Sequence, residues 1–281
     1  LHDSWAFTGG CHSPQECRGF ENRCGHCPEL CSRREQDPSR WNWNRKKAVW
    51  DNMDFTVIAP SRWLAERAAG SSLLHGRRIV AIPNAMDATV FHPMDRRMAR
   101  AALNLPMEKS LVFFGAHGAL TDWNKGADLW KKALSFLARQ KANVESLMAG
   151  SAAGFGNLPV KTHELGVLAP DRMAMAMAAA DVVVVPSRME NLPNMVAESL
   201  ACGTPVAAFA VGGIPEMLRP GETGFLARPH DPEELAKGIG QLLEKGESMR
   251  EACAAFARET YAPETVARRH LDLYRSLLER S

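Results

Sequence analysis

Long hydrophobic runs, a marked excess of charge and a leader-like start are all missing from this sequence. Its longest apolar runs, 181–186 and 205–211, are far shorter than the ~20 residues that a membrane-spanning helix needs. The formal net charge is only +2, which argues against a dedicated nucleic-acid binder and predicts no nucleic-acid partner. The opening residues have neither the basic stretch nor the apolar core of a signal peptide. We therefore expect a cytoplasmic protein.

An initiator methionine is also missing, and the first residues read as the end of a buried strand. We therefore expect a chain whose first domain lacks its beginning. The 281 residues are 46% hydrophobic and 23% charged, which is an ordinary globular composition and enough for one large or two ordinary domains.

The second half of the chain alternates short apolar segments with helical patterns. Because wholly apolar strands between helices are typical of a parallel sheet covered on both faces, and crossovers are right-handed, this pattern predicts a doubly wound α/β domain. Its ligands then bind beyond the carboxyl ends of the strands. The expected strands are 110–115, 144–150, 160–167, 181–185 and 205–208, and the expected helices are 125–138, 171–180, 193–202, 231–260 and 263–280.

The first half is shorter and less regular. Residues 1–35 are irregular and rich in Cys and Gly, and residues 40–92 read as helix 43–52, strand 55–59, helix 62–69 and strand 78–82. Ser61 is the expected N-cap of the second helix. We predict a first domain over 1–92, a second over 93–262, and a C-terminal helix, 263–281, that packs back toward the first domain.

Two carboxylates lie on either side of the helix start at 193. Glu190 is in the loop before it and Glu198 is one turn inside it. Pro193 suits the first turn of a helix, where its missing N–H is not needed. The amides of Asn194 and Met195 then point outward at a helix N-terminus, which is an anion-binding position. With the Gly-rich loop 211–216 beside it, this edge of the sheet fits a nucleoside diphosphate.

The stretch Glu190-Asn-Leu-Pro-Asn-Met-Val-Ala-Glu198 resembles the E-x7-E signature of the family 4 retaining glycosyltransferases, which have the two-domain GT-B fold. The start of the chain, Leu1-His-Asp-Ser-Trp5 with Gly-Gly-Cys11, is similar to a subset of that family found in bacterial surface-polysaccharide clusters. Other segments that match the family in order are Ala59-Pro-Ser-Arg-Trp-Leu-Ala65, Ile82-Pro-Asn-Ala-Met-Asp87, Phe91-His-Pro93, Lys125-Gly126, Ser199-Leu-Ala-Cys-Gly-Thr-Pro-Val206, Gly212-Gly-Ile-Pro-Glu216 and Gly221-Glu-Thr-Gly-Phe-Leu226.

The resemblance implies two Rossmann-like domains and a role for each matching residue. The donor would be a nucleoside diphosphate sugar, and the acceptor a glycan or a lipid-linked glycan at the inner face of the plasma membrane. Glu198 would bind the ribose hydroxyls, and Glu190 and His2 would face the transferred sugar. Lys125 and the amides of Asn194 and Met195 would neutralise the diphosphate leaving group, so catalysis would need no metal or other cofactor; no Asp-x-Asp metal motif follows a strand. We expect weak or absent catalysis from this chain alone.

Three departures from the family pattern bear on the donor. Gly115-Ala116-His117 stands where the family has Gly-Arg, so cationic help would come from Lys125 alone or with His117. Pro193 and Asn191 replace glycines of the loop. Two other functions were weighed: a nucleotide-sugar epimerase of the same shape, and a non-catalytic protein that binds a nucleotide sugar.

Four cysteines form a C-x5-C-x6-C-x2-C pattern: Cys11, Cys17, Cys24 and Cys27. This spacing in an irregular segment is compatible with a structural zinc site, with disulfides or with free thiols, and we favour zinc over the other two because a cytoplasmic protein disfavours disulfides. A catalytic zinc is not expected, since all four ligands would be protein. The segment 40–50 combines Trp41, Trp43 and Trp50 with basic residues. It fits either peripheral contact with an anionic membrane or a helix that packs its Trp face on its own domain.

Overall fold

The computed structural model describes residues 1–115, 122–150 and 157–279. The chain forms two compact units, Leu1–Pro83 and Asn84–Ser281. The boundary lies before the predicted 92/93 because residues 84–92 belong to the second unit. Met86 and Phe91 are buried in its core, and the Met86 amide donates to the Tyr261 carbonyl at 2.9 Å. The packing of 263–281 toward the first domain stays a prediction.

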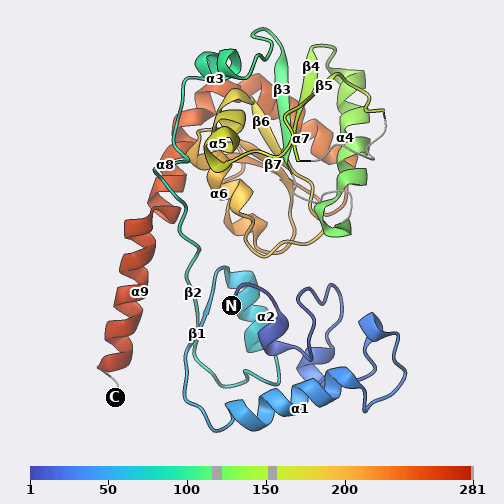
Figure 1. Cartoon of the computed structure of the whole chain (residues 1–281), viewed down its shortest axis with the longest axis vertical. Helices are drawn as coiled ribbons and strands as arrows, with labels where there is room; N and C mark the ends of the chain where they lie inside the picture. The colour runs from blue at the N-terminus through green and yellow to red at the C-terminus, as the bar shows by residue number, and fades with distance from the viewer. Residues whose placement is uncertain (116–121, 151–156, 280–281) are drawn as a thin grey trace. The chain divides into compact units, whose positions relative to one another are not determined.

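The second unit has a six-stranded parallel sheet with the order β5-β4-β3-β6-β7-β8 (Figure 1). The predicted doubly wound domain is therefore confirmed. The last strand, β8, is not among the strands expected from the sequence. The strands are β3 (Ser110–Gly115), β4 (Val144–Ala149), β5 (Thr162–Glu164), β6 (Val182–Val185), β7 (Val206–Phe209) and β8 (Gly224–Ala227).

Helices cover both faces of this sheet. Helices α4 and α7 pack against each other on one side, and α5 and α6 pack on the other (Figure 1). The expected helix 231–260 is two helices, because Gly246 ends the first of them and a short turn follows. The helices are α3 (Arg96–Ala102), α4 (Ala127–Gln140), α5 (Pro170–Ala179), α6 (Asn194–Ala201), α7 (Pro232–Lys245), α8 (Arg250–Tyr261) and α9 (Pro263–Leu278).

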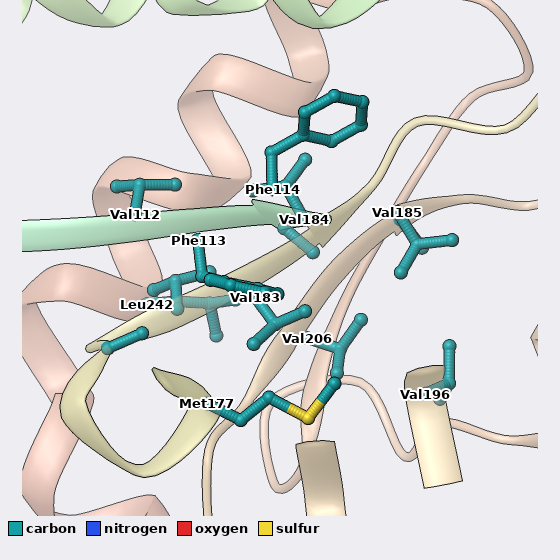
Figure 2. Close-up of a cluster of buried hydrophobic side chains, with 14 of the residues drawn as sticks. Val112, Phe113, Phe114, Met177, Val183, Val184, Val185, Val196, Val206 and Leu242 are labelled. Carbon is teal, nitrogen blue, oxygen red and sulfur yellow. The ribbon is translucent and has the colours of Figure 1, made fainter. Parts of the chain in front are cut away.

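The central strands carry no polar face because both of their faces are covered. Figure 2 shows Val112 and Phe114 on one side of β3 and Phe113 on the other, and each of these side chains is at most 2% exposed. The four valines of β6 are buried as well. This is the burial expected of a parallel sheet between two helical layers.

The first unit contains a two-stranded parallel sheet, β1 (Val57–Ala59) with β2 (Ile79–Ala81), and two helices, α1 (Pro38–Trp50) and α2 (Arg62–Ala69). Ser61 caps α2 as predicted, since its Oγ accepts the Leu64 amide at 3.1 Å. Helix α1 begins earlier than expected because Asp37 caps it, accepting the amides of Ser39 and Arg40. The core of the first unit comprises Phe7, Phe20, Trp43, Val57, Ala59, Leu64, Ala68, Leu73 and Leu74.

A buried arginine fixes the amino ends of the two central strands. Arg100, on α3, is 4% exposed, and its guanidinium donates to the Ala179 carbonyl at 2.9 Å and to Asp181 Oδ2 at 2.8 Å. Asp181 Oδ2 also accepts the Leu111 amide of β3 at 2.7 Å. Because Asp181 directly precedes β6, this network sets where β3 and β6 begin and thereby where they end.

We predict that Arg100→Ala lowers the free energy of unfolding by about 3 kcal/mol, because Asp181 keeps only its ion pair with Arg96 and the Ala179 carbonyl loses its donor. Arg100→Lys should not restore this loss, since one ammonium cannot replace a fork of donors that reaches several acceptors. Urea unfolding measures both. The control is Arg275→Ala, which removes an exposed ion pair with Asp272 and should change stability by less than about 1 kcal/mol. An Arg100→Ala loss no larger than that of the control would contradict the prediction.

Candidate functional site

The candidate site lies in the second unit, at the carboxyl ends of β3 and β6. These neighbouring strands are the point where the strand order reverses, since the chain continues from β3 to β4 on one side and from β6 to β7 on the other. In open α/β sheets the loops diverge at such a switch point and leave a crevice for a ligand. Two of the predicted site residues come from the loops that follow these strands: Lys125 after β3 and Glu190 after β6.

Lys125 and Glu190 meet in an ion pair. Lys125 closes the turn η4 (Trp123–Lys125) before α4, and its Nζ donates to Glu190 Oε1 at 2.6 Å. The Ser187 hydroxyl donates to the same oxygen at 3.2 Å. No described residue donates a hydrogen bond to Oε2. The pair is partly shielded from water, with side chains 33% and 16% exposed, so its attraction is less screened than that of a surface pair.

Two glycines hold the backbone of the Glu190 loop on either side. A Cβ on Gly126 would lie 1.9 Å from the Pro186 carbonyl oxygen, and one on Gly212 would lie 1.6 Å from the Glu190 carbonyl oxygen. Both glycines have a positive φ, of 66° and 57°, a conformation that residues with a side chain rarely adopt. The Gly213 amide also donates to the Glu190 carbonyl, at 3.2 Å. The loop therefore sits between two backbone segments that approach it directly.

The N-terminus of α6 lies beside this loop and is uncapped. Pro193 precedes the helix and provides no side-chain cap. No described group accepts a hydrogen bond from the amides of Asn194 and Met195, while the next amide bonds to Pro193. The Met195 side chain reaches the end of β3, because its Cε lies 3.2 Å from where a Cβ on Gly115 would stand. Two amides are thus available to an anion at the switch point.

Glu198 is the second carboxylate of the pattern, and burial raises the pKa of its carboxyl group. No described residue forms a hydrogen bond or an ion pair with its side chain. A half-buried carboxylate that lacks a partner is unfavourable unless a ligand supplies the hydrogen bonds. Its place on α6, one turn after the free amides, makes it available to hydroxyl groups of such a ligand.

Two of the predicted residues remain, His2 and His117. His2 belongs to the first unit, where it is exposed. The neighbouring Asp3 binds His12 Nδ1 at 2.6 Å and the Trp5 amide at 2.8 Å. His117 lies outside the described residues. The roles of all these residues in binding or catalysis stay predictions.

The zinc prediction is not supported. Among the residues that the structure describes, no three Cys, His, Asp or Glu side chains are arranged so that they could hold a metal ion. All seven cysteines are free thiols, and burial raises the pKa of Cys11 to about 11. Cys11 and Cys27 border a pocket of about 630 Å³ instead of closing around an ion. Cys24 Sγ accepts the Gly9 amide at 3.1 Å.

The tryptophans of the segment 40–50 differ in how deeply they are buried. Trp43 is 4% exposed and belongs to the core of the first unit, whereas Trp41 is 60% exposed. The Arg45 guanidinium lies 4.7 Å from the centre of the Trp41 ring. Within the described part of the chain, no helix has both the length and the apolar character to cross a bilayer.

Two residues that precede Glu190 in its loop were not predicted as site residues, Ser187 and Arg188. Ser187 is 3% exposed and binds Glu190, as described above. Arg188 binds the turn that carries Lys125: its Nη1 donates to the Trp123 carbonyl at 2.9 Å. A polar residue next to a site residue is too common a pattern to indicate either contact, since the sequence does not show where a loop side chain points.

Comparisons with known structures agree with this geometry. Sucrose-phosphate synthase from Thermosynechococcus elongatus superposes with a TM-score of 0.72 and 26% identity, over 92% of this chain and 67% of that chain. HepE from Anabaena, solved in complex with UDP, superposes with a TM-score of 0.70 and 22% identity, over 84% of this chain and 68% of that one. The chain has the α/β GT-B glycosyltransferase fold.

The sequence of the second unit is also similar to a known family. Residues 108–245 match the family described as Glycosyl transferases group 1. The D-inositol 3-phosphate glycosyltransferase of Mycobacterium avium (strain 104) is 37% identical over 181 residues, which are 59% of this chain and 41% of that protein. The chain thus spans about two fifths of the length of the curated relatives it matches.

We predict that Glu198→Gln stabilises the protein without ligand at neutral pH, because it removes a charge that burial disfavours. The raised pKa means that the folded state binds the Glu198 proton more tightly than the unfolded state does. The destabilisation by the carboxylate is therefore complete above the folded-state pKa and disappears as the pH falls toward the ordinary value of 4.5. The difference in Tm between variant and wild type should shrink over the same range. A variant that is less stable than wild type at pH 7 would contradict this.

Proposed function

We propose that this chain binds the donor of a retaining glycosyltransferase, which transfers a sugar from a nucleoside diphosphate sugar to a glycan or lipid-linked acceptor. Lys125 and the amides of Asn194 and Met195 bind the diphosphate, Glu198 binds the ribose hydroxyls, and Glu190 binds the transferred sugar. His2 faces that sugar from the first unit. The work belongs to bacterial polysaccharide biosynthesis in the cytoplasm, at the inner face of the plasma membrane.

The observation that carries this proposal is the Lys125–Glu190 pair at 2.6 Å, beside the uncapped start of α6. Departure of a nucleoside diphosphate develops negative charge on its oxygens. A fixed ammonium group and two helix-end amides stabilise that charge without having to reorganise during the reaction. Glu190 holds the ammonium in place and keeps Oε2 for a sugar hydroxyl.

The relatives support the donor half of the proposal. HepE was solved with UDP, which is the leaving group that a UDP-sugar would produce. The acceptor differs among the matches, since the curated relatives act on D-inositol 3-phosphate. The similarity to them covers 59% of this chain, so the acceptor assignment rests on the first-unit sequence motif and not on these relatives.

The first test is a thermal-shift panel of UDP-, GDP-, ADP- and dTDP-sugars. A donor at 100 times its Kd stabilises the folded state by about 2.7 kcal/mol, which corresponds to a rise in Tm of roughly 5–10 °C for a domain of this size. Lys125→Ala and Glu198→Gln should each weaken the binding of the active donor by about 10- to 100-fold, because each loses a charge-assisted hydrogen bond. The proposal fails if none of the four sugars changes Tm.

The second test separates an enzyme from a protein that only binds nucleotide sugars. Release of nucleoside diphosphate by the full-length protein is measured with and without glycan acceptors, in the wild type and in Glu190→Ala. We expect turnover to fall by at least about 100-fold in the variant, as when an electrostatic contact to the transition state is removed, while nucleotide binding persists. Equal turnover in both proteins would refute the role of Glu190. Donor binding without turnover in the wild type would favour the non-catalytic alternative.

A further inference from the structure

The turn that carries Lys125 has few contacts of its own to keep it in place. It is the single turn η4, Trp123–Lys125, and Trp123 is 59% exposed. One end rests on the sheet, where Gly126 approaches the Pro186 carbonyl. A short exposed turn is normally among the first segments of a protein to open. Among the described residues, the other contacts that tie this turn to the loop after β6 come from the Lys125–Glu190 pair and from Arg188.

Arg188 contacts this turn at three points and the first turn of α4 at a fourth. Its amide donates to the Asn124 carbonyl at 2.7 Å, and its Nη1 donates to the Trp123 carbonyl at 2.9 Å. Its Nη2 donates to Asp128 Oδ2 at 2.7 Å, in the first turn of α4. The guanidinium lies 4.4 Å from the centre of the Trp123 ring. The Arg188 side chain is only 11% exposed although Asp128 is 53% exposed, so the arginine is covered by the turn that it binds.

From this geometry we propose that Arg188 is a positioning residue for the phosphate-binding lysine. It fastens the turn Trp123–Lys125 to the loop that carries Glu190, and so fixes the Lys125 backbone at the site where a diphosphate binds. The inference rests on the proposed function for the identity of the ligand. Arg188 itself points away from that ligand, since both of its terminal nitrogens are bound to the turn and to α4.

The arrangement requires arginine and not merely a positive charge. One guanidinium satisfies a carbonyl on one side and a carboxylate on the other while its flat face stacks on an indole, and an ammonium group cannot do all three. The hydrogen bond from Arg188 lowers the pKa of Asp128, so the contact between them stays charged at neutral pH. The arginine holds the lysine backbone, so that the Nζ, which has three N–H donors, can bind Glu190 and a phosphate at the same time.

The test measures the Kd of a nucleoside diphosphate and of the matching monophosphate. The pairs are UDP and UMP, GDP and GMP, ADP and AMP, and dTDP and dTMP. In Arg188→Ala we expect the Kd of the bound nucleoside diphosphate to rise about 10-fold, because a misplaced cation loses preorganised contacts. The monophosphate, which lacks the β-phosphate, should change by less than about 2-fold. Arg188→Lys should recover only part of the loss. The matched control is Lys141→Ala, which breaks an exposed ion pair between the end of α4 and Glu244 on α7, and it should leave both constants unchanged.

A double-mutant cycle shows whether Arg188 acts through Lys125. If it does, adding Arg188→Ala to Lys125→Ala should weaken diphosphate binding by less than about 2-fold further, because the two changes remove the same interaction. Additive effects would overturn the inference, as would equal losses for mono- and diphosphate, which indicate general unfolding of the site.

Amide hydrogen exchange tests the clamp without any ligand. The Lys125 and Gly126 amides bond to Asp122 and Trp123 within the turn, and in Arg188→Ala they should exchange about 10-fold faster while the amides of β3 keep their rates. Unchanged exchange at the turn would overturn the inference. If the wild type binds no nucleotide at all, the proposed function fails, and the exchange result still decides whether Arg188 holds the turn.

Discussion

Close approach of backbone to backbone around residues 186–190 is the constraint on which the site depends. Gly126 and Gly212 have no room for a Cβ, since each would place that atom within 2 Å of a carbonyl oxygen of this loop. The loop after β6 is thus held between the start of α4 and the turn after β7. Every charged contact described at the site, from Lys125 to Glu190, depends on this spacing of three chain segments.

The charges at the site are stable only in part without a ligand. Lys125 and Glu190 neutralise each other, but Glu198 is partly buried with no described partner and two amides at the start of α6 lack acceptors. The fold tolerates these groups because the rest of the unit is strongly consolidated by the buried strands β3 and β6 and by the Arg100–Asp181 network beneath them. The unfavourable groups face the switch point, where a polar, anionic molecule would satisfy them together.

Much of the fold was predictable because its signals are local. Wholly apolar strands such as 182–185, a serine before α2 and a proline before α6 identify elements by short-range physics. Topology predicts only that loops after neighbouring strands meet at one edge of the sheet, and the pairing of Lys125 with Glu190 was not predicted. The contacts of Arg188 and Ser187 were not predictable, since they depend on where loop side chains point. The cysteine spacing suggested zinc, but spacing does not determine whether sulfur atoms converge, and here two of them border a pocket instead.

The Lys125–Glu190 contact joins residues that are 65 positions apart in the chain. During synthesis, a ribosome that has released β3, β4 and β5 has exposed the lysine but neither the glutamate loop nor the glycine turn that supports it. The crevice therefore comes into existence only when β7 and its following turn have joined the sheet. Nucleotide binding would thus occur only once the domain is complete, and partially synthesised chains would not be stabilised by nucleotides in the cell.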